Sequence, residues 1–542
     1  VFMSEQSSKV KKSIVVSGLV GSGGFFVAKL IGLFYAIPFS YILGSDAYNA
    51  YYGSAYQIYS YLLNIFTAGF PFAIATLVAK YMELKNYKTV LQVKRVSLLF
   101  LTLTGFLGMA VMMGLAGVLS PVLTDSQQGV PIMTTVLCIL GIAVFLVPIL
   151  SAYRGFIQGC KEMQEYAYSQ AFEQLFRVGF LLSVSCLAVY VLGMDRVWAL
   201  YAAVLSTSIA AIAGIVQIYG FSKKTEQAIA KDAKHSSVKP IPSKELFKEF
   251  LLLSVPYMVS AVLGYSDSIF NTTLLPLGLK GFNYSSEQFN TIMSAFNYSG
   301  LKLNSIPMIL APGFTAAIIP HISAALAVDD KKTIRKNVKE CMNIVMFIGM
   351  FLSFAILLYA KPLIRCLFLT QDLDLSASVI RWVTIEGFLG TIVPVVASLM
   401  MALRLQKSLL KRLFVGTILK GVLIVPFTWV LGFRGTIIAT IVSYLYMFFL
   451  NLNEIGRRYK INFMPTAQVF VKTAAGLAAM TVSCGLFSML GLGNTDAGRI
   501  MCFMTTVVNG LLSTIVFAAV VLYLQVPQYL FHFKLQNPKR KA

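Results

Sequence analysis

Long apolar stretches, separated by short polar segments, recur along the whole chain. Each is about twenty residues or longer and apolar on every side, which is the length that an α-helix needs to cross a hydrocarbon core of roughly 30 Å. Strands of a membrane barrel would instead alternate polar and apolar residues over about ten positions. The pattern therefore predicts an all-α polytopic membrane protein with 14 transmembrane helices. We expect these spans at 13–43, 47–80, 96–120, 130–153, 166–193, 197–221, 249–278, 287–325, 341–363, 377–403, 409–432, 435–456, 466–492 and 498–526.

The placement of lysine and arginine between the apolar stretches supports this count. Of the 45 basic residues, 33 lie in the two termini and the even-numbered loops, and 7 lie in the odd-numbered loops. Short cytoplasmic loops of membrane proteins carry an excess of lysine and arginine. Because a missed span would destroy the alternation, the split favours fourteen spans with both the N- and the C-terminus in the cytoplasm.

Composition excludes the soluble classes of protein. Hydrophobic residues make up 57% of the chain, charged residues only 12%, and the mean hydropathy is +0.75. A soluble domain carries about 25% charged residues. The net charge of +23 would suggest a nucleic-acid partner in a soluble protein. In a membrane protein the same excess belongs to cytoplasmic loops or to an internal path for an anion, so no nucleic-acid partner is expected.

The sequence contains no recognisable motif for catalysis or for cofactor binding. The seven cysteines form no CxxC pair and the three histidines are scattered, so neither a metal site nor a Ser/His/Asp triad is expected. A GxxxxGK[ST] phosphate loop is missing, which argues against ATP hydrolysis by this chain. We therefore expect a transporter, not an enzyme, that needs no cofactor or metal and is driven by a secondary gradient or the membrane potential.

A polar segment after the sixth span suggests that twelve of the spans form two six-helix lobes. The second and eighth spans resemble each other: each has an asparagine, then glycine and proline breaks, then a Lys-Thr pair. Repeats of six spans keep the same orientation in the membrane, so the lobes would be parallel repeats related by a pseudo-twofold axis along the membrane normal. We expect an N-lobe at 1–221, a cytoplasmic linker at 222–248, a C-lobe at 249–456, and two extra helices with a basic tail at 457–542.

Charged residues within the spans are the candidates for function. A charge at mid-bilayer costs a few kcal/mol even on the mildest scale. Lys29, Lys302 and Lys420 lie deep in spans one, eight and eleven. Glu386 in span ten and Asp267 at the outer end of span seven are the acidic candidates. Since the deep cations outnumber the deep acids, the cavity favours an anion, and lysine can hold a pyrophosphate as a point charge.

Other charged residues lie where they would support such a cavity. Glu173 and Arg177 are four residues apart, so they share a helix face, and we expect them to form an ion pair. Asp46 flanks the outer end of its span. Arg154 and Lys161 are expected at the cytoplasmic mouth, where they would help to collect an anionic headgroup.

Two segments are specific enough to indicate a family. One reads Arg154-Gly-Phe-Ile-Gln-Gly159, and the other reads Ser169-Gln-Ala-Phe-Glu-Gln-Leu-Phe-Arg177. Together with the first two spans they resemble the Gram-positive branch of the MurJ-type lipid II flippases, the group of YtgP and the stage V sporulation protein B relatives. That branch belongs to the multidrug/oligosaccharidyl-lipid/polysaccharide (MOP) exporter superfamily. The resemblance covers most of the first 220 residues and is looser beyond them.

The resemblance implies a MATE-like fold around a central cationic cavity, with a lipid-tail groove near spans thirteen and fourteen. It implies a multi-pass protein of the bacterial plasma membrane that moves undecaprenyl-pyrophosphate-linked disaccharide pentapeptide from the inner to the outer leaflet by alternating access. Lys29 stands where relatives have a cavity arginine, and Asp46 matches an acidic position of the family. Tyr35 and Asn64 replace further arginines of the Gram-negative branch. Lys420 intrudes where some relatives hold a sodium ion, and we expect its ammonium group to replace that ion.

Three alternatives remain open from the sequence. The chain could move another undecaprenyl-linked glycan, such as a capsule, teichoic or exopolysaccharide precursor. It could be a cation-coupled multidrug exporter, in which Asp267 or Glu386 would be required. It could also be a lipid-binding scaffold for wall synthesis, in which cavity substitutions would leave function intact. Membrane lipids and cell-wall synthesis proteins are the further partners that we expect.

Overall fold

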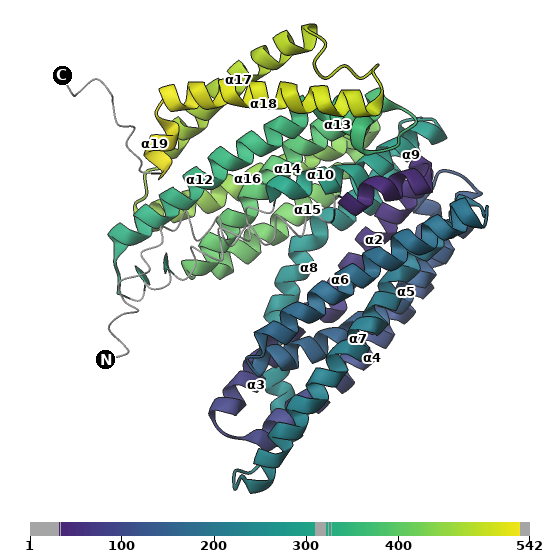
Figure 1. Cartoon of the computed structure of the whole chain (residues 1–542). Helices are drawn as coiled ribbons and strands as arrows, with labels where there is room; N and C mark the ends of the chain where they lie inside the picture. The colour runs from purple at the N-terminus through teal and green to yellow at the C-terminus, as the bar shows by residue number, and fades with distance from the viewer. Residues whose placement is uncertain (1–31, 33, 309–320, 323–324, 327, 532–542) are drawn as a thin grey trace, which may run out of the picture. The chain divides into compact units, whose positions relative to one another are not determined.

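The computed structural model describes residues 32, 34–308, 321–322, 325–326 and 328–531 (Figure 1). The described residues group into two compact units. One unit comprises Pro38–Tyr298, and the other comprises the described residues up to Ile37 together with those from Ser299 onward. Throughout the described ranges the regular secondary structure is helical, which confirms the predicted all-α class.

The Pro38–Tyr298 unit contains a bundle of long helices. Its elements after the short apolar helix Phe34–Leu43 are α2 (Asp46–Thr67), α3 (Phe70–Glu83), α4 (Tyr87–Leu123), α5 (Gly129–Gly159), α6 (Met163–Cys186), a π-helical turn η1 (Leu187–Val191), α7 (Arg196–His235), α8 (Ser243–Gly281), α9 (Ser286–Ser294) and a second π-helical turn η2 (Ala295–Gly300), which reaches the border of the unit.

The second unit is built from the C-terminal helices. They are α10 (Leu301–Met308), α12 (Lys331–Leu358), α13 (Ala360–Leu367), α14 (Leu373–Ala402), α15 (Gln406–Leu431), α16 (Phe433–Tyr459), α17 (Met464–Met489), α18 (Arg499–Tyr523) and α19 (Val526–Phe531). Its core joins α12, α14 and the α17–α18 pair through residues such as Val345, Val395 and Phe517.

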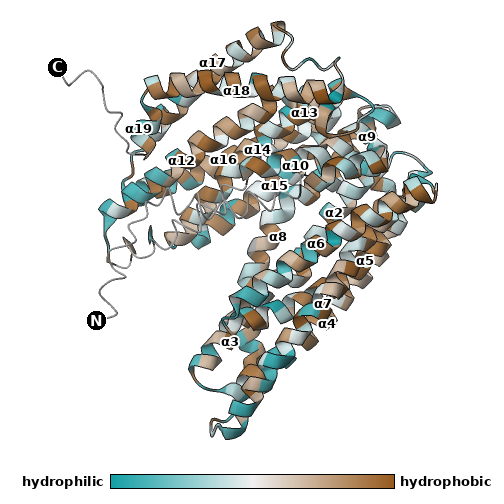
Figure 2. Cartoon of the chain, viewed as in Figure 1, coloured by the Kyte–Doolittle hydropathy of each residue, from teal (hydrophilic) through white to brown (hydrophobic). Residues whose placement is uncertain are grey.

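Twelve helices in the described part of the chain are long and apolar enough to cross a membrane. They correspond one to one with twelve of the predicted spans, and the chain is therefore a multi-pass membrane protein. The remaining two predicted spans, 13–43 and 287–325, both extend into residues outside the described part. Hydrophobic residues predominate along helices such as α4 and α5 (Figure 2), as a hydrocarbon environment requires.

The break between α2 and α3 follows from a glycine and a proline. Gly69 adopts a left-handed φ of 84°, and a Cβ there would lie 2.6 Å from the carbonyl oxygen of Ser254. Pro71, at the start of α3, lacks the N–H that a continuous helix would need. The helix is therefore interrupted between Thr67 and Phe70, within one 38-residue span.

The polar segment after the sixth span is mostly helical. α7 continues to His235 and α8 begins at Ser243, so the linker proper is seven residues, 236–242. This short linker is hydrogen-bonded to the start of α4. The amide of Asn86, the residue before α4, donates to the Lys239 carbonyl at 3.1 Å, and the Ile241 N–H donates to the hydroxyl of Thr89 in the first turn at 3.1 Å. The lobe limits expected from the sequence stay a prediction.

Candidate functional site

Two of the predicted cavity residues contact each other. The Lys302 ammonium group, on α10, donates a hydrogen bond of 3.0 Å to the Tyr35 hydroxyl and lies 4.7 Å from the centre of the Tyr35 ring. Tyr35 is 8% exposed, and Lys302 is half-buried. A lysine has three N–H donors, so one bond to Tyr35 leaves two for an anion. The ring holds the ammonium group in place, because a cation is attracted to the face of an aromatic ring.

The helix that carries Lys302, α10, packs closely on α14. Asn304 is 3% exposed, and a Cβ on Gly387 would lie 2.9 Å from its side chain. Within the described ranges, neither polar atom of the Asn304 amide has a hydrogen-bond partner. A buried amide without a partner is unfavourable by roughly 1–3 kcal/mol. The packing of α10 at this asparagine therefore lowers the stability of the folded state.

Lys420 lies on the buried face of α15. The buried residues of this helix include Gly416, Lys420, Ile424 and Thr428, which follow one another at intervals of four residues, and Lys420 is 2% exposed. The face packs on α16, because the Ser443 hydroxyl donates to the Gly416 carbonyl at 2.7 Å and Thr428 contacts Thr436 at 2.7 Å. Lys420 is therefore buried on the face of α15 that packs on α16, as its central position in the span predicts.

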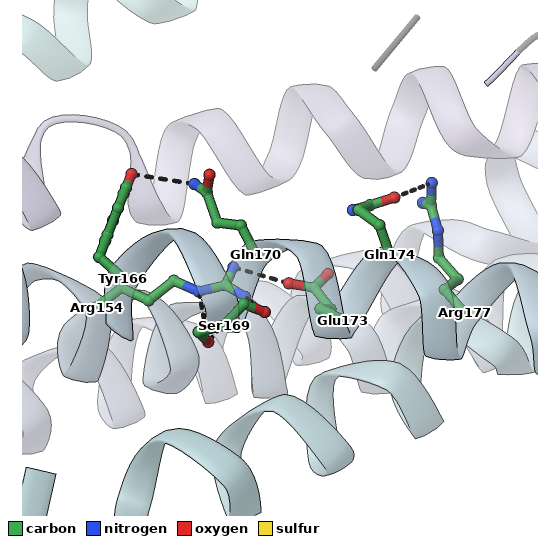
Figure 3. A network of polar contacts seen from close by, with 7 residues as sticks. All are labelled: Arg154, Tyr166, Ser169, Gln170, Glu173, Gln174 and Arg177. Atoms are coloured by element: carbon green, nitrogen blue, oxygen red, sulfur yellow. Dashed lines mark hydrogen bonds and ion pairs between the residues drawn. The ribbon is translucent and has the colours of Figure 1, made fainter. Parts of the chain in front are cut away.

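The two family motifs meet in one network (Figure 3). Arg154 of α5 forms an ion pair with Glu173 of α6 at 2.7 Å, and both side chains are 13% exposed. The same guanidinium group donates to the Ser169 carbonyl at 2.8 Å and to the Ser169 hydroxyl at 3.2 Å. Arg154 therefore binds three groups of α6, the Glu173 carboxylate and the Ser169 carbonyl and hydroxyl.

This network changes two expectations. The carboxylate of Glu173 pairs with Arg154 of the neighbouring helix, whereas the Arg177 guanidinium donates to Gln174 at 2.8 Å. A spacing of four residues allows an ion pair but does not exclude a better partner on another helix. Arg154, expected at the cytoplasmic mouth, has its donors committed within the Pro38–Tyr298 unit.

The glycines of the first motif have a separate role. A Cβ on Gly155 would lie 2.8 Å from the Pro71 carbonyl oxygen, and a Cβ on Gly159 would lie 2.6 Å from the Val78 Cβ. The two glycines are four residues apart and form one face of α5, which packs closely on α3. The Arg154-to-Gly159 motif thus joins α5 to α3 through its glycines and to α6 through its arginine.

Asp46 lies in a polar seam inside the same unit. Its carboxylate, 2% exposed at the start of α2, accepts a hydrogen bond of 3.0 Å from the Thr291 hydroxyl of α9. Further along the seam the Asn297 amide donates to Ser54 at 3.1 Å and accepts from Thr272 at 3.2 Å. Sequence reasoning identified Asp46 but missed its partners, because threonine and asparagine in an apolar helix give only a weak signal.

The remaining predicted residues lie on several different helices. Lys161 is 71% exposed and pairs with Glu83 at 2.5 Å. The Asn64 amide donates to the Ser60 carbonyl of its own helix at 2.7 Å. Asp267 lies half-buried on α8, and Glu386 is buried on α14. Lys29 lies outside the described residues.

Comparison with known proteins identifies the family. Residues 14–326, more than half of the chain, match the model of the family described as polysaccharide biosynthesis protein. The lipid II flippase MurJ of Bacillus subtilis (strain 168) is 26% identical over 493 residues, which cover 88% of this chain and 89% of that protein.

Two solved structures show the same fold. The lipid II flippase MurJ in an inward closed conformation matches 94% of this chain and 100% of its own, with a TM-score of 0.64 at 12% identity. An inward-facing MATE family multidrug resistance transporter matches 78% of this chain and 95% of its own, with a TM-score of 0.61 at 15% identity. Both likenesses confirm the MATE-like fold that the motifs implied. The chain belongs to the polysaccharide biosynthesis protein family.

Proposed function

We propose that the chain is a flippase that moves an undecaprenyl-pyrophosphate-linked peptidoglycan precursor, lipid II, from the inner to the outer leaflet of the bacterial plasma membrane. In this proposal fourteen spans place both termini in the cytoplasm. They form two six-helix lobes and two further helices, and transport proceeds by alternating access.

The observation that supports this proposal most directly is the contact between Lys302 and Tyr35. The phenol ring and hydroxyl hold the ammonium group at one position, with two N–H donors left for an anion. A lysine within a span favours an anionic substrate group, because an unneutralised charge there is costly. A pyrophosphate linkage is the anion that the lipid-linked precursors of this family of transporters would present.

The proposed cycle follows from charge. Lys302, together with Lys29 from the first span, would attract the pyrophosphate when the cavity is open to the cytoplasm. Binding neutralises like charges that otherwise disfavour closure of the cavity. Release on the outer side restores the repulsion and returns the protein to the open state, with the membrane potential or an ion gradient as the energy source.

Rescue of a strain depleted of its lipid II flippase tests the proposal. The wild-type chain is expected to restore lipid II at the outer leaflet, whereas Lys302→Gln and Lys29→Gln are expected to fail at equal expression. Lys411→Gln, which removes an exposed lysine of α15, is the matched control and should rescue fully. Rescue by both cavity variants would overturn the proposal. Failure of the wild-type chain in this strain, with rescue of a strain lacking a capsule or teichoic precursor flippase, would assign another undecaprenyl-linked glycan.

A further inference from the structure

A groove with two lysines runs along the first part of α8. Its volume is about 810 Å³, within the range of roughly 300–1,000 Å³ that is common for small-molecule sites. Among the residues that the structure describes, its lining comes from this helix: Lys244, Glu245, Phe247, Lys248, Leu251, Leu252, Val255 and Pro256. Sequence analysis counted the two lysines only as loop charges.

The two lysines lie one helical turn apart on the same face. Both are exposed, and in the part of the chain that the structure describes neither has an ion pair or a side-chain hydrogen bond. Other lysines of this unit are neutralised: Lys80 pairs with Glu249 at 2.5 Å and Lys94 with Glu226 at 2.7 Å. Like charges four residues apart destabilise a helix, and an anion bound between them removes that cost.

An apolar surface continues from the lysines along the helix. Leu251 and Leu252 follow Lys248 by three and four residues, and Val255 follows one turn later. Leu252 is 66% exposed and Val255 is 40% exposed. Glu245 also lines the groove, so the net charge of the lining is +1 with both lysines protonated. A cationic end joined to an apolar stripe is complementary to an amphiphile with an anionic head.

We propose that this groove binds the head of a polyprenyl pyrophosphate lipid, with Lys244 and Lys248 on the two phosphates and the first prenyl carbons against Leu251, Leu252 and Val255. The inference rests on the proposed function and adds a site for the substrate lipid before transport. Two ammonium groups one turn apart match two adjacent phosphates better than the single phosphodiester of a phospholipid. The site also supplies the cationic mouth that Arg154 and Lys161 do not, since each of those is held by a carboxylate.

Binding of undecaprenyl pyrophosphate to the full chain in nanodiscs tests this site. The double variant K244Q/K248Q is expected to bind about tenfold more weakly, since a hydrogen bond to a charged group contributes more than a neutral one. The control K231Q/K234Q removes two exposed lysines of α7 and should bind as the wild type does. Leu252→Asn should weaken binding of the lipid but leave competition by inorganic pyrophosphate unchanged.

The outcomes separate this site from the proposed function. Unchanged binding by K244Q/K248Q, with Lys302→Gln impaired, would overturn the groove alone. Equal competition by phosphatidylglycerol would also overturn it, because the groove would then be a site for bulk anionic lipid. Absence of undecaprenyl pyrophosphate binding by the wild-type chain would overturn the proposed function together with the groove.

Discussion

Arg154 of α5 and Glu173 of α6 form an ion pair of 2.7 Å that joins the two most distinctive sequence segments of the chain. Both side chains are 13% exposed. If one partner were removed, the remaining charge would be neither paired nor well solvated. Removing one member of a buried pair is therefore worse than removing both.

A double-mutant cycle on this pair should show strong coupling. We expect Glu173→Gln and Arg154→Gln each to lower the free energy of unfolding by about 1–3 kcal/mol, and the double variant to lower it by less than the sum. Thermal unfolding in detergent measures these values. Lys161→Gln breaks the exposed pair with Glu83 and should leave the free energy of unfolding nearly unchanged, because water screens an exposed ion pair. Additive losses of unfolding free energy at Arg154 and Glu173 would contradict a direct interaction between the two side chains.

The glycines of the first motif should resist even a methyl group. Gly155→Ala and Gly159→Ala place a Cβ 2.8 Å from the Pro71 carbonyl oxygen and 2.6 Å from the Val78 Cβ, so α5 must move away from α3. We expect each to destabilise the protein by about 1–3 kcal/mol in the same unfolding assay. Gly179→Ala on α6 is the control: a Cβ there meets no atom of the described residues within 4 Å, so alanine should be neutral or stabilising. Equal effects at all three sites would contradict the close packing.

The sequence predicts a feature well when the feature depends on neighbouring residues, and poorly when it depends on contacts between distant helices. Spans such as Gln406–Leu431 were predicted well, because hydrocarbon imposes its requirement on each residue separately. The partner of Glu173 was not, because Arg154 comes from another helix and no spacing rule relates the two. The extension of α7 to His235 was also missed, since a polar sequence can form a loop or a helix that projects beyond the membrane. The contact of Lys302 with Tyr35 required the fold, as 267 residues separate them.

Asp330 should make the stability of α12 depend on pH. Its carboxylate caps the helix by accepting from the Thr333 hydroxyl at 2.6 Å and from the Thr333 N–H at 3.0 Å, and these bonds lower the pKa of Asp330 below its ordinary value of 3.8. Since the folded pKa is depressed, the contribution to stability is complete above pH 3.8 and is lost as the pH falls through the folded pKa.

Asp330→Asn separates this charge effect from the cap itself, because asparagine also caps helices well. The wild type is expected to unfold at a higher temperature than Asp330→Asn at neutral pH, and the difference should shrink as the pH falls from 3.8 through the lower pKa of the folded state. Thermal unfolding of both proteins across the acidic range is the measurement. A difference that persists at the lowest pH would show that the cap does not depend on the charge.

Tyr35 should matter to transport through its hydroxyl as well as its ring. Tyr35→Phe keeps the ring under the Lys302 ammonium group but removes the hydrogen bond of 3.0 Å, so we expect transport of the lipid to fall by about tenfold. Tyr35→Leu removes both contacts and should reduce transport further. Tyr51→Phe, which alters a buried tyrosine of α2, controls for general loss of a hydroxyl group. Full activity of Tyr35→Leu would mean that Lys302 does not depend on the tyrosine for its position.

Transport is expected to be independent of sodium, because Lys420 supplies a fixed positive charge on the buried face of α15. A sodium ion and an ammonium group at the same place would repel each other. Because the ammonium group is part of the chain, it occupies the place permanently and disfavours binding of the ion. Flipping by the purified chain in vesicles should therefore proceed equally in sodium and in potassium buffers of the same ionic strength. In Lys420→Gln the fixed charge is gone, so a requirement for sodium should appear if the ion can take its place. A strict sodium requirement in the wild type would contradict this role, since the ammonium group would then not be replacing the ion.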